Sequence, residues 1–260
     1  MQAIKRLKEL LKKMLNNKVF LVPLAAIAII FPRILNRKTI LYPLLVIVVL
    51  ILTIKITDDF IEYSNIERNY ELAPTLISTK RAKLIGASVV IEKNGYILTA
   101  AHLVDDDTPT EISINIENNE IPVKILARDT TLDLMALKAN HHFSREVPIR
   151  TEKLTSWEKV YSISCPFGVC HTYVEGNFFL DGNSTEINSF SEILLFNLHL
   201  SGGSSGGGIF DENGNLVSIY SWTYAQNKDF PSNAIGPSIR IICNFLDENR
   251  IPYRKARYLW

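Results

Sequence analysis

The sequence lacks an excess of charge of either sign. Its 28 Lys and Arg residues nearly balance 27 Asp and Glu residues, which leaves a formal net charge of +1 over 260 residues. A protein that binds nucleic acid through its phosphates usually carries a strongly basic domain or face. The composition therefore gives no support to nucleic-acid binding, and we expect no nucleic acid among the partners.

Cysteine is scarce as well. The three cysteines are Cys165, Cys170 and Cys243, and none of them forms a Cys-X-X-Cys pair. Cys165 and Cys170 flank a Pro-Phe-Gly turn, so a disulfide between them is possible, but spacing alone cannot establish it. Together with His171 they would supply part of a zinc site, yet no fourth ligand is evident. We favour buried thiols and expect neither a metal nor a cofactor.

Long apolar runs are missing too. A transmembrane helix needs about 20 apolar residues, with a lower limit of about 17, and both Val19–Phe31 and Thr39–Ile54 are shorter. Thr39–Ile54 is richer in Leu and β-branched residues and is the better candidate for a span. Val19–Phe31 contains Pro23 and precedes Pro32, so it would form a thin second span or a re-entrant segment. We predict that residues 19–57 anchor the chain in a membrane.

The N-terminal segment, residues 1–18, has apolar positions on one helical face and Lys and Arg on the other. This pattern is typical of a helix that lies on an anionic membrane surface, although an ordinary solvated helix would show it too. With one span, the positive-inside rule places this basic end in the cytoplasm and the C-terminal part outside. Two spans would return the C-terminal part to the cytoplasmic side. We predict one span, followed by a juxtamembrane linker over residues 58–80, in which the polar segment Asp58–Leu72 is either part of the linker or a short helix.

From Lys83 onward the chain consists of short apolar segments separated by turn residues. Asn94-Gly95 is a strong hairpin signal, and Asn118-Asn119 and Asp211–Gly214 mark two further turns. Frequent short strands without helical periodicity favour antiparallel β-barrels. The exception is Ile239–Glu248, which has the pattern of a C-terminal helix. The predicted fold class is therefore all-β with one closing helix.

One Gly- and Ser-rich run, Ser201–Phe210, lies between two strand-like apolar segments, where a flexible linker is not expected. Within this run, Ser205 fits the pattern Gly-X-Ser-Gly-Gly. His102 ends the run Thr-Ala-Ala-His and Asp133 opens an apolar segment, so the chain order is His, Asp, Ser. A serine hydroxyl needs a base to become nucleophilic, and the base needs an orienting carboxylate. We predict that Ser205 is the nucleophile, His102 the base and Asp133 the orienting acid.

Neighbouring residues offer weaker alternatives. Ser204 has no glycine directly after it, and Ser201 lacks a glycine two residues before it. Asp129 is a rival for the acid, but a turn-forming role is its simpler interpretation. We predict an oxyanion hole at Gly203, Ser204 and Ser205, with the N–H groups of the first and last as donors. Each such donor contributes roughly 10²–10³ to the rate.

Four segments of the chain resemble HtrA/Deg-type trypsin-like serine proteases. They are Gly86–His102, Ala127–Lys138, Val160–Gly168 with its Pro-Phe-Gly turn, and Pro231–Leu246. The resemblance covers roughly residues 81–250. It implies a protease domain over residues 81–260 with a chymotrypsin-like double β-barrel. Each barrel would have six strands, and the active site would lie in the cleft between them.

The chain departs from that family at Gly208, where a proline is common, and at Ser204, where Asn or Asp is usual. A glycine at position 208 adds conformational freedom beside the oxyanion loop. No residues follow Trp260 to form the PDZ domain that many of these proteases carry, so we expect no peptide-triggered activation through such a domain. Trimers occur in the family, which implies a homo-oligomer.

The resemblance also locates the pocket for the substrate residue that precedes the cut, at Asn197–Leu200. This segment contains no carboxylate, so a preference for Lys or Arg lacks its counter-charge. Leu198 and Leu200 favour an apolar pocket. His199 either points inward, where it would donate to Gln or Glu, or faces away, as the alternation of an extended segment favours.

The leading hypothesis is a membrane-tethered serine endopeptidase outside the cytoplasm that cleaves unfolded or membrane-proximal polypeptides. Ser221 and Trp222 would pair with the substrate as an added β-strand. One alternative is a viral-type chymotrypsin-like protease that cuts a few defined sites. The other is a tethered pseudoprotease that binds peptides without cleaving them.

Overall fold

The computed structural model describes residues 41–78, 83–104, 112–116, 119–182, 192–224 and 233–257. The predicted basic helix of residues 1–18 and the apolar run Val19–Phe31 lie outside the described residues, as does Asn118 of one predicted turn. Two compact units divide the chain between Phe60 and Ile61.

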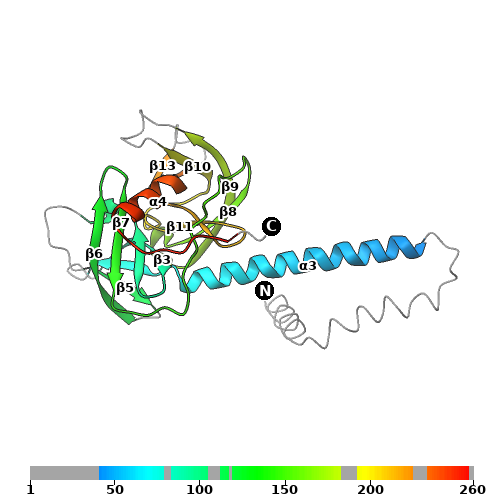
Figure 1. Cartoon of the computed structure of the whole chain (residues 1–260), viewed down its shortest axis with the longest axis horizontal. Coiled ribbons are helices and arrows are strands. Elements are labelled where there is room, and N and C mark those ends of the chain that lie inside the picture. Colours follow the sequence, from blue (N-terminus) through cyan, green and yellow to red (C-terminus); the bar gives the residue numbers. More distant parts are fainter. Residues whose placement is uncertain are drawn as a thin grey trace. The chain divides into compact units, whose positions relative to one another are not determined.

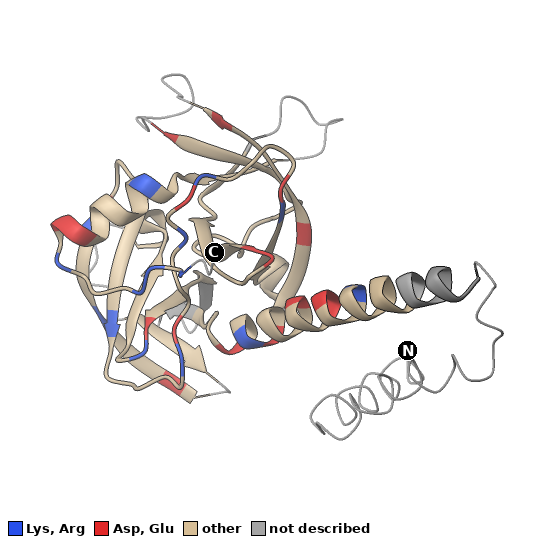
Figure 2. Ribbon diagram, turned by 45° about the vertical axis from the view of Figure 1, so that its right-hand side comes forward, with Lys and Arg blue, Asp and Glu red and all other residues tan. Residues whose placement is uncertain are grey.

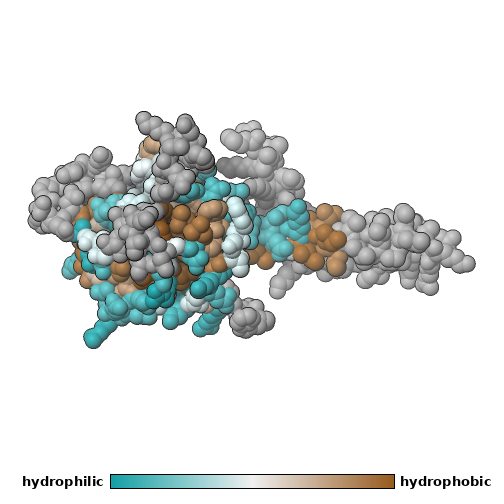
Figure 3. All heavy atoms as spheres, turned by 90° about the horizontal axis from the view of Figure 1, so that it is seen from above, coloured by the Kyte–Doolittle hydropathy of each residue, from teal (hydrophilic) through white to brown (hydrophobic). Residues whose placement is uncertain are grey.

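The helix α3, Leu41–Glu71, crosses this division. Its described side chains in the first unit form an exposed apolar surface, visible in Figure 3 and made up of Val49, Leu50, Ile51, Leu52, Ile54 and Ile56. Within the part of the chain that the structure describes, we find no helix with the length and apolar character needed to cross a membrane.

The first sheet contains seven strands in the order β2-β1-β5-β6-β7-β4-β3 (Figure 1). They are β1 (Thr75–Ser78), β2 (Lys83–Ala87), β3 (Val89–Glu92), β4 (Tyr96–Thr99), β5 (Ile112–Ile116), β6 (Asn119–Asp129) and β7 (Leu134–Ala139). All neighbouring pairs are antiparallel. β3 and β4 form the hairpin predicted at Asn94-Gly95, where Gly95 adopts φ +97°. That prediction is confirmed.

The second sheet also has seven antiparallel strands, in the order β12-β11-β8-β9-β10-β14-β13. They are β8 (Lys159–Ser164), β9 (Thr172–Gly182), β10 (Ile193–Asn197), β11 (Gly208–Asp211), β12 (Leu216–Ile219), β13 (Trp222–Tyr224) and β14 (Asn233–Pro237). The helix α4, Ile239–Glu248, follows. In the ribbon of Figure 2 the positions of acidic and basic residues are interspersed, in keeping with the near-zero net charge.

The seventh strand of each sheet arises from a break within one strand. In the first sheet, Ser88 separates β2 from β3, and these are the two end strands of the order. In the second sheet, Tyr220 and Ser221 separate β12 from β13, which are again the two ends. Because consecutive segments occupy opposite ends, each sheet must curl towards closure. The result is two curled half-barrel sheets with a C-terminal helix, consistent with the predicted chymotrypsin-like fold.

One hydrophobic core joins both sheets and α4. It contains Val90 and Ile97 from the first sheet, Tyr161 and Phe210 from the second, and Phe245 from the helix, all nearly inaccessible to solvent. The Tyr161 and Phe210 rings lie 5.3 Å apart. Burying one large apolar side chain contributes about 1.5–3 kcal/mol, so this shared core holds the two sheets in a fixed relation.

The helix α4 closes the second unit as predicted. Its N-terminus is capped by Ser238, whose hydroxyl accepts from the Ile241 N–H at 3.3 Å. Such a cap contributes typically about 1 kcal/mol. The buried face carries Ile241, Ile242, Phe245 and Leu246.

The second part of α3, Ile61–Glu71, packs within the second unit. Asn69 is fully buried. Its Nδ2 donates to the hydroxyl of Tyr161 and to the carbonyl of Gly214, both at 3.0 Å. Arg68 donates to the same Gly214 carbonyl at 3.2 Å. The helix is thereby bound to the turn between β11 and β12.

Of the two alternatives for Asp58–Leu72, a linker or a short helix, the structure has a helix, and residues 75–78 form a strand rather than a linker. The helix continues to Glu71, and β1 pairs with both β2 and β5. Between them, the Leu72 carbonyl accepts from the Val90 N–H at 2.9 Å. The physical reason is that β1 supplies a strand that the first sheet needs between β2 and β5.

Candidate active site

His102 and Asp133 meet because their strands are paired. His102 lies in the short 3-10 turn Ala101–Leu103 after β4, and Asp133 directly precedes β7. β4 and β7 are antiparallel, with Thr99 opposite Met135. The end of one strand therefore adjoins the start of the other.

The contact between the two side chains is extensive. Nδ1 of His102 lies 3.0 Å and 2.9 Å from the two carboxylate oxygens of Asp133, and Oδ1 also accepts from the His102 backbone N–H at 2.8 Å. Asp133 is 1% exposed, whereas the His102 side chain is 36% exposed. An ionised carboxylate only accepts hydrogen bonds, so Nδ1 carries the proton and Nε2 of the neutral ring is a free acceptor.

Asp133 adopts a left-handed backbone conformation with φ +52°. This region is uncommon for residues other than glycine, although Asp and Asn enter it more readily than most. The Ala101 N–H donates to the Asp133 carbonyl at 3.2 Å, which ties the strained residue to the His102 turn. The rival acid, Asp129, instead accepts from the N–H groups of Thr131 and Leu132, as expected of a turn residue.

Ser205 is brought to the same place by the loop between β10 and β11. Its carbonyl accepts from the Ala87 N–H at 2.8 Å. The next residue, Gly206, packs so closely against Thr99 and Ala87 that a Cβ there would overlap both. Because Thr99 lies three residues before His102, this contact places Ser205 beside the His102 turn. Among the described residues, no hydrogen bond joins the Ser205 hydroxyl to His102.

The loop around Ser205 leaves two backbone donors unused. The Ser204 N–H donates to Ser201 O at 3.0 Å, and the Gly207 N–H donates to Ser204 O at 2.9 Å. Within the described part of the chain, the N–H groups of Gly203 and Ser205 have no acceptor. Gly203 has φ +93°, and a Cβ there would overlap the carbonyl of Cys165. Two free donors beside a serine hydroxyl can stabilise a developing oxyanion.

Residues 86–219 match the family of trypsin-like peptidase domains. This is more than half of the chain. The chain belongs to this family. The match agrees with the resemblance to trypsin-like proteases that the sequence predicted.

Several curated proteins are similar to this trypsin-like peptidase. A probable periplasmic serine endoprotease DegP-like of Pseudomonas fulva is 27% identical over 179 residues, which cover 68% of this chain and 37% of that protein. A protein of the same description from Pseudomonas putida W619 is 26% identical over 152 residues, 58% of this chain and 32% of that protein. The chain thus spans about a third of the length of these relatives.

Solved structures show the same fold. The HtrA-type protease AlgW with decapeptide has a TM-score of 0.64 at 17% identity, covering 73% of this chain and 67% of that one. The active form of the Rv3671c protease from M. tuberculosis has a TM-score of 0.61 at 13% identity, covering 74% and 86%.

In this chain, the residues predicted for substrate binding differ in how much of each is exposed to solvent. Leu198 and Leu200 are buried in a second core cluster with Phe178 and Phe196. His199 between them is exposed. The predicted alternation is present, with His199 on the opposite side from its two neighbours.

Trp222 begins β13, and Ser221 directly precedes it; β13 pairs with β14 and is an end strand of the described sheet. The Ser221 N–H donates to Ile235 O at 2.9 Å. The Trp222 ring stacks on His102, with ring centroids 6.2 Å apart. β13 therefore presents one backbone edge next to the candidate base. No local sequence pattern predicts this stacking, because Trp222 and His102 lie far apart in the chain.

Two of the three cysteines are not the buried thiols that the sequence favoured. Cys165 and Cys170 are joined in a disulfide, and Cys243 is free and half-buried. The disulfide leaves neither sulfur as a thiolate ligand for zinc. No group of three or more His, Cys, Asp or Glu side chains among the described residues is placed to hold a metal ion.

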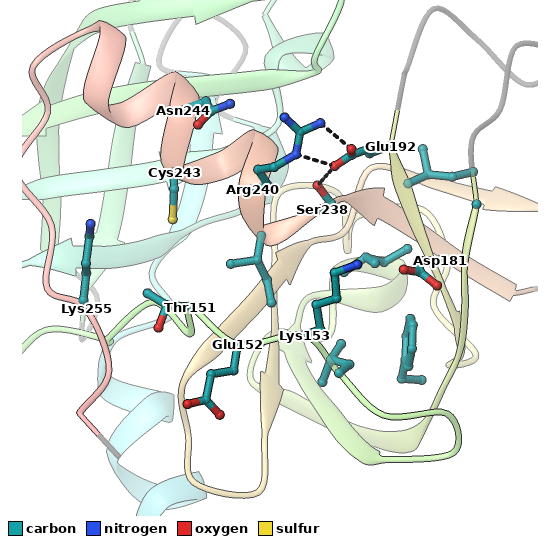
Figure 4. Close-up of a pocket in the computed structure, with 16 residues that line it drawn as sticks. Thr151, Glu152, Lys153, Asp181, Glu192, Ser238, Arg240, Cys243, Asn244 and Lys255 are labelled. Atoms are coloured by element: carbon teal, nitrogen blue, oxygen red, sulfur yellow. Dashed lines mark hydrogen bonds and ion pairs between the residues drawn. The ribbon is translucent and has the colours of Figure 1, made fainter. Parts of the chain in front are cut away.

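A pocket of about 740 Å³ lies elsewhere, at the N-terminus of α4 (Figure 4). Within it, Arg240 and the Ser238 hydroxyl both donate to the carboxylate of Glu192. The hydrogen bond from Arg240 holds the pKa of Glu192 below its usual value. None of the three predicted catalytic residues lines this pocket.

Proposed function

We propose that this chain is a serine endopeptidase whose triad is His102, Asp133 and Ser205. The observation that carries the proposal is the contact of both Asp133 oxygens with Nδ1 of His102. This contact supports the tautomer with the ring proton on Nδ1, which leaves Nε2 as the nitrogen that can accept a proton, as a general base requires.

The proposed reaction follows from the positions of these groups. Ser205 Oγ attacks the carbonyl carbon of the scissile peptide bond while Nε2 of His102 takes its proton. The carbonyl oxygen becomes an oxyanion that accepts from the N–H groups of Gly203 and Ser205. His102 then protonates the leaving amine, and a water molecule hydrolyses the acyl-enzyme by the reverse sequence. Asp133 orients the ring and stabilises its charged form.

The proposal assigns fewer residues to the oxyanion hole than the sequence predicted. Ser204 was expected to take part, but its N–H already donates to Ser201 O. We therefore assign the two donors to Gly203 and Ser205. Loss of either donor would lower the rate by roughly 10²–10³.

The substrate would bind as an extended strand along β13, with Ser221 and Trp222 at the contact. The pocket for the residue before the cut would lie at Asn197–Leu200, where Leu198 and Leu200 belong to the apolar core behind it. Polypeptides that are unfolded or close to a membrane are the proposed substrates. The similar proteins of Pseudomonas are described as probable periplasmic endoproteases, which supports a location outside the cytoplasm.

We also propose that residues 19–57 anchor the protease domain to a membrane and that the chain forms a homo-oligomer. The two apolar runs of the sequence and the exposed apolar side chains of α3 support the anchor (Figure 3). Oligomerisation is supported by the family resemblance.

A fluorophosphonate probe on the full chain in detergent tests the triad. Labelling is expected in the wild type and in Ser204→Ala, and it should be lost in Ser205→Ala. Ser204→Ala is a matched control, since its hydroxyl is buried and makes no hydrogen bond among the described residues. Labelling lost in Ser204→Ala but kept in Ser205→Ala would make the assignment wrong. Peptide binding without labelling would indicate the pseudoprotease.

A further inference from the structure

The loop between β8 and β9 lies against the candidate oxyanion hole. Its ends, Cys165 and Cys170, are joined by a disulfide. Cys165 is buried at the end of β8, whereas the tip of the loop is open to solvent, with Phe167 86% and Val169 66% exposed. An exposed tip gains little from packing, so backbone contacts and the disulfide must hold the loop in place.

The decisive contact joins this loop to one peptide group. The Phe167 N–H donates to the Gly202 carbonyl at 2.8 Å. That carbonyl belongs to the same planar peptide as the Gly203 N–H, which is a proposed oxyanion donor. In a trans peptide, C=O and N–H point in opposite directions. A bond that fixes the Gly202 carbonyl on the loop side therefore aims the Gly203 N–H away from the loop.

A second contact limits movement of the same peptide. The Cys165 carbonyl lies so close to Gly203 that a Cβ there would overlap it. The same carbonyl accepts from the Gly168 N–H at 3.0 Å. The cysteine that forms one end of the disulfide thus also forms one wall of the oxyanion loop.

The backbone of the loop is one that needs external support. Phe167 and His171 have φ of +52° and +58°, and Gly168 has φ +82°. Residues other than glycine rarely adopt this left-handed backbone conformation. They keep it only where contacts with the surrounding structure hold them there. A covalent link across five positions is such a constraint.

We propose that the Cys165–Cys170 disulfide is a positioning element for the Gly203 N–H, so that its reduction lowers the rate of acyl transfer. This inference rests on the proposed serine endopeptidase function. The reductant would be a dithiol. One thiolate attacks a sulfur of the disulfide, more readily that of the half-buried Cys170, and a mixed disulfide forms. The second thiol of the reductant then attacks the reductant's own sulfur in this mixed disulfide and displaces the protein sulfur. Both cysteines are left as thiols, and the reductant is left as a disulfide.

The expected kinetic signature separates positioning from general damage. An oxyanion donor acts on the transition state and little on the bound substrate, so kcat should fall while KM stays nearly constant. Misaiming one donor is a smaller change than its loss, which costs roughly 10²–10³. We therefore expect kcat to fall about tenfold to a hundredfold. Inhibition by a peptide aldehyde, which forms a tetrahedral oxyanion, should weaken in parallel.

The experiment uses the full chain in detergent and a fluorogenic peptide, before and after dithiothreitol and again after reoxidation. Thiol alkylation and mass spectrometry establish the redox state, and circular dichroism reports the fold. Wild type and the matched control Cys243→Ser should lose and regain kcat in the same way. The double variant Cys165→Ser, Cys170→Ser should have the low kcat before any treatment, and dithiothreitol should not change it.

Two outcomes overturn the proposal alone. One is an unchanged kcat after verified reduction of an enzyme whose hydrolysis depends on Ser205. The other is a loss of kcat accompanied by an equal rise in KM or by unfolding. Should the double variant not fold, reduction of the folded wild type gives the same answer. Absence of Ser205-dependent hydrolysis in the oxidised enzyme overturns the proposed function as well.

Discussion

Asp133 Oδ1 accepts from both the backbone N–H and the ring Nδ1 of His102. One carboxylate therefore fixes the position of the residue and the tautomer of its ring together. Strand pairing between β4 and β7 creates this relationship before any substrate is present.

Asp133→Asn is expected to lower kcat by roughly 10⁴, because an amide NH₂ facing Nδ1 favours the wrong tautomer. Asn tolerates the positive φ of this position, so the unfolding temperature should change little. Peptide hydrolysis and thermal unfolding measure the two effects. Asp129→Asn is the matched control and should keep its activity. An equal loss in Asp129→Asn would contradict the assignment of the acid.

Cleavage is expected after apolar residues, and His199→Ala should leave this preference unchanged, because Asn197–Leu200 contributes apolar side chains and no carboxylate. A peptide library analysed by mass spectrometry measures the preference. Dominant cleavage after Lys or Arg would refute the apolar pocket. Cleavage after Gln or Glu that disappears in His199→Ala would show that the ring faces the substrate.

A chain that begins at Ile61 is expected to fold, and one that begins at Arg81 is not. The shorter chain lacks β1 and also lacks Asn69, whose absence leaves the Tyr161 hydroxyl without its donor. An unpaired buried polar group costs about 1–3 kcal/mol. Thermal unfolding of the purified fragments measures the difference. A third fragment that begins at Leu72 keeps β1 without the helix and should have an intermediate thermal stability. Equal stability of the three fragments would argue against a domain boundary at Ile61.

Alkylation of Cys243 is expected to be slow near neutral pH. Burial raises the pKa of its thiol, so the thiol keeps its proton to higher pH and the reactive thiolate is rarer at about pH 8 than in an exposed cysteine. The rate should rise with pH until the raised pKa is passed. Intact-mass analysis after iodoacetamide treatment measures it. A rate equal to that of the urea-unfolded chain at the same pH would contradict the prediction.

The sequence was informative where function depends on local runs. Thr-Ala-Ala-His, the apolar segment after Asp133 and Gly-X-Ser-Gly-Gly are each continuous, and the pairing of β4 with β7 brings the ends of the first two together. The turn at Asn94-Gly95 and the helix Ile239–Glu248 are local signals of the same kind.

The sequence was less informative where structure depends on distant partners. Residues 58–80 are polar and look like a linker, yet Asn69 is buried because the Gly214 carbonyl and the Tyr161 hydroxyl accept from it. Those acceptors exist only in the folded second sheet. The disulfide was left open for a similar reason, since spacing does not reveal the positive φ values that turn Cys170 back towards Cys165.

The position of β13 at the end of the described sheet has a consequence for what the proposed protease would select. Trp222–Tyr224 would recognise its target through main-chain groups, which every polypeptide carries. A folded protein has already used those groups in its own helices and sheets. The edge would therefore distinguish proteins by conformation, and a damaged copy of any protein would become a target without sharing a sequence with another.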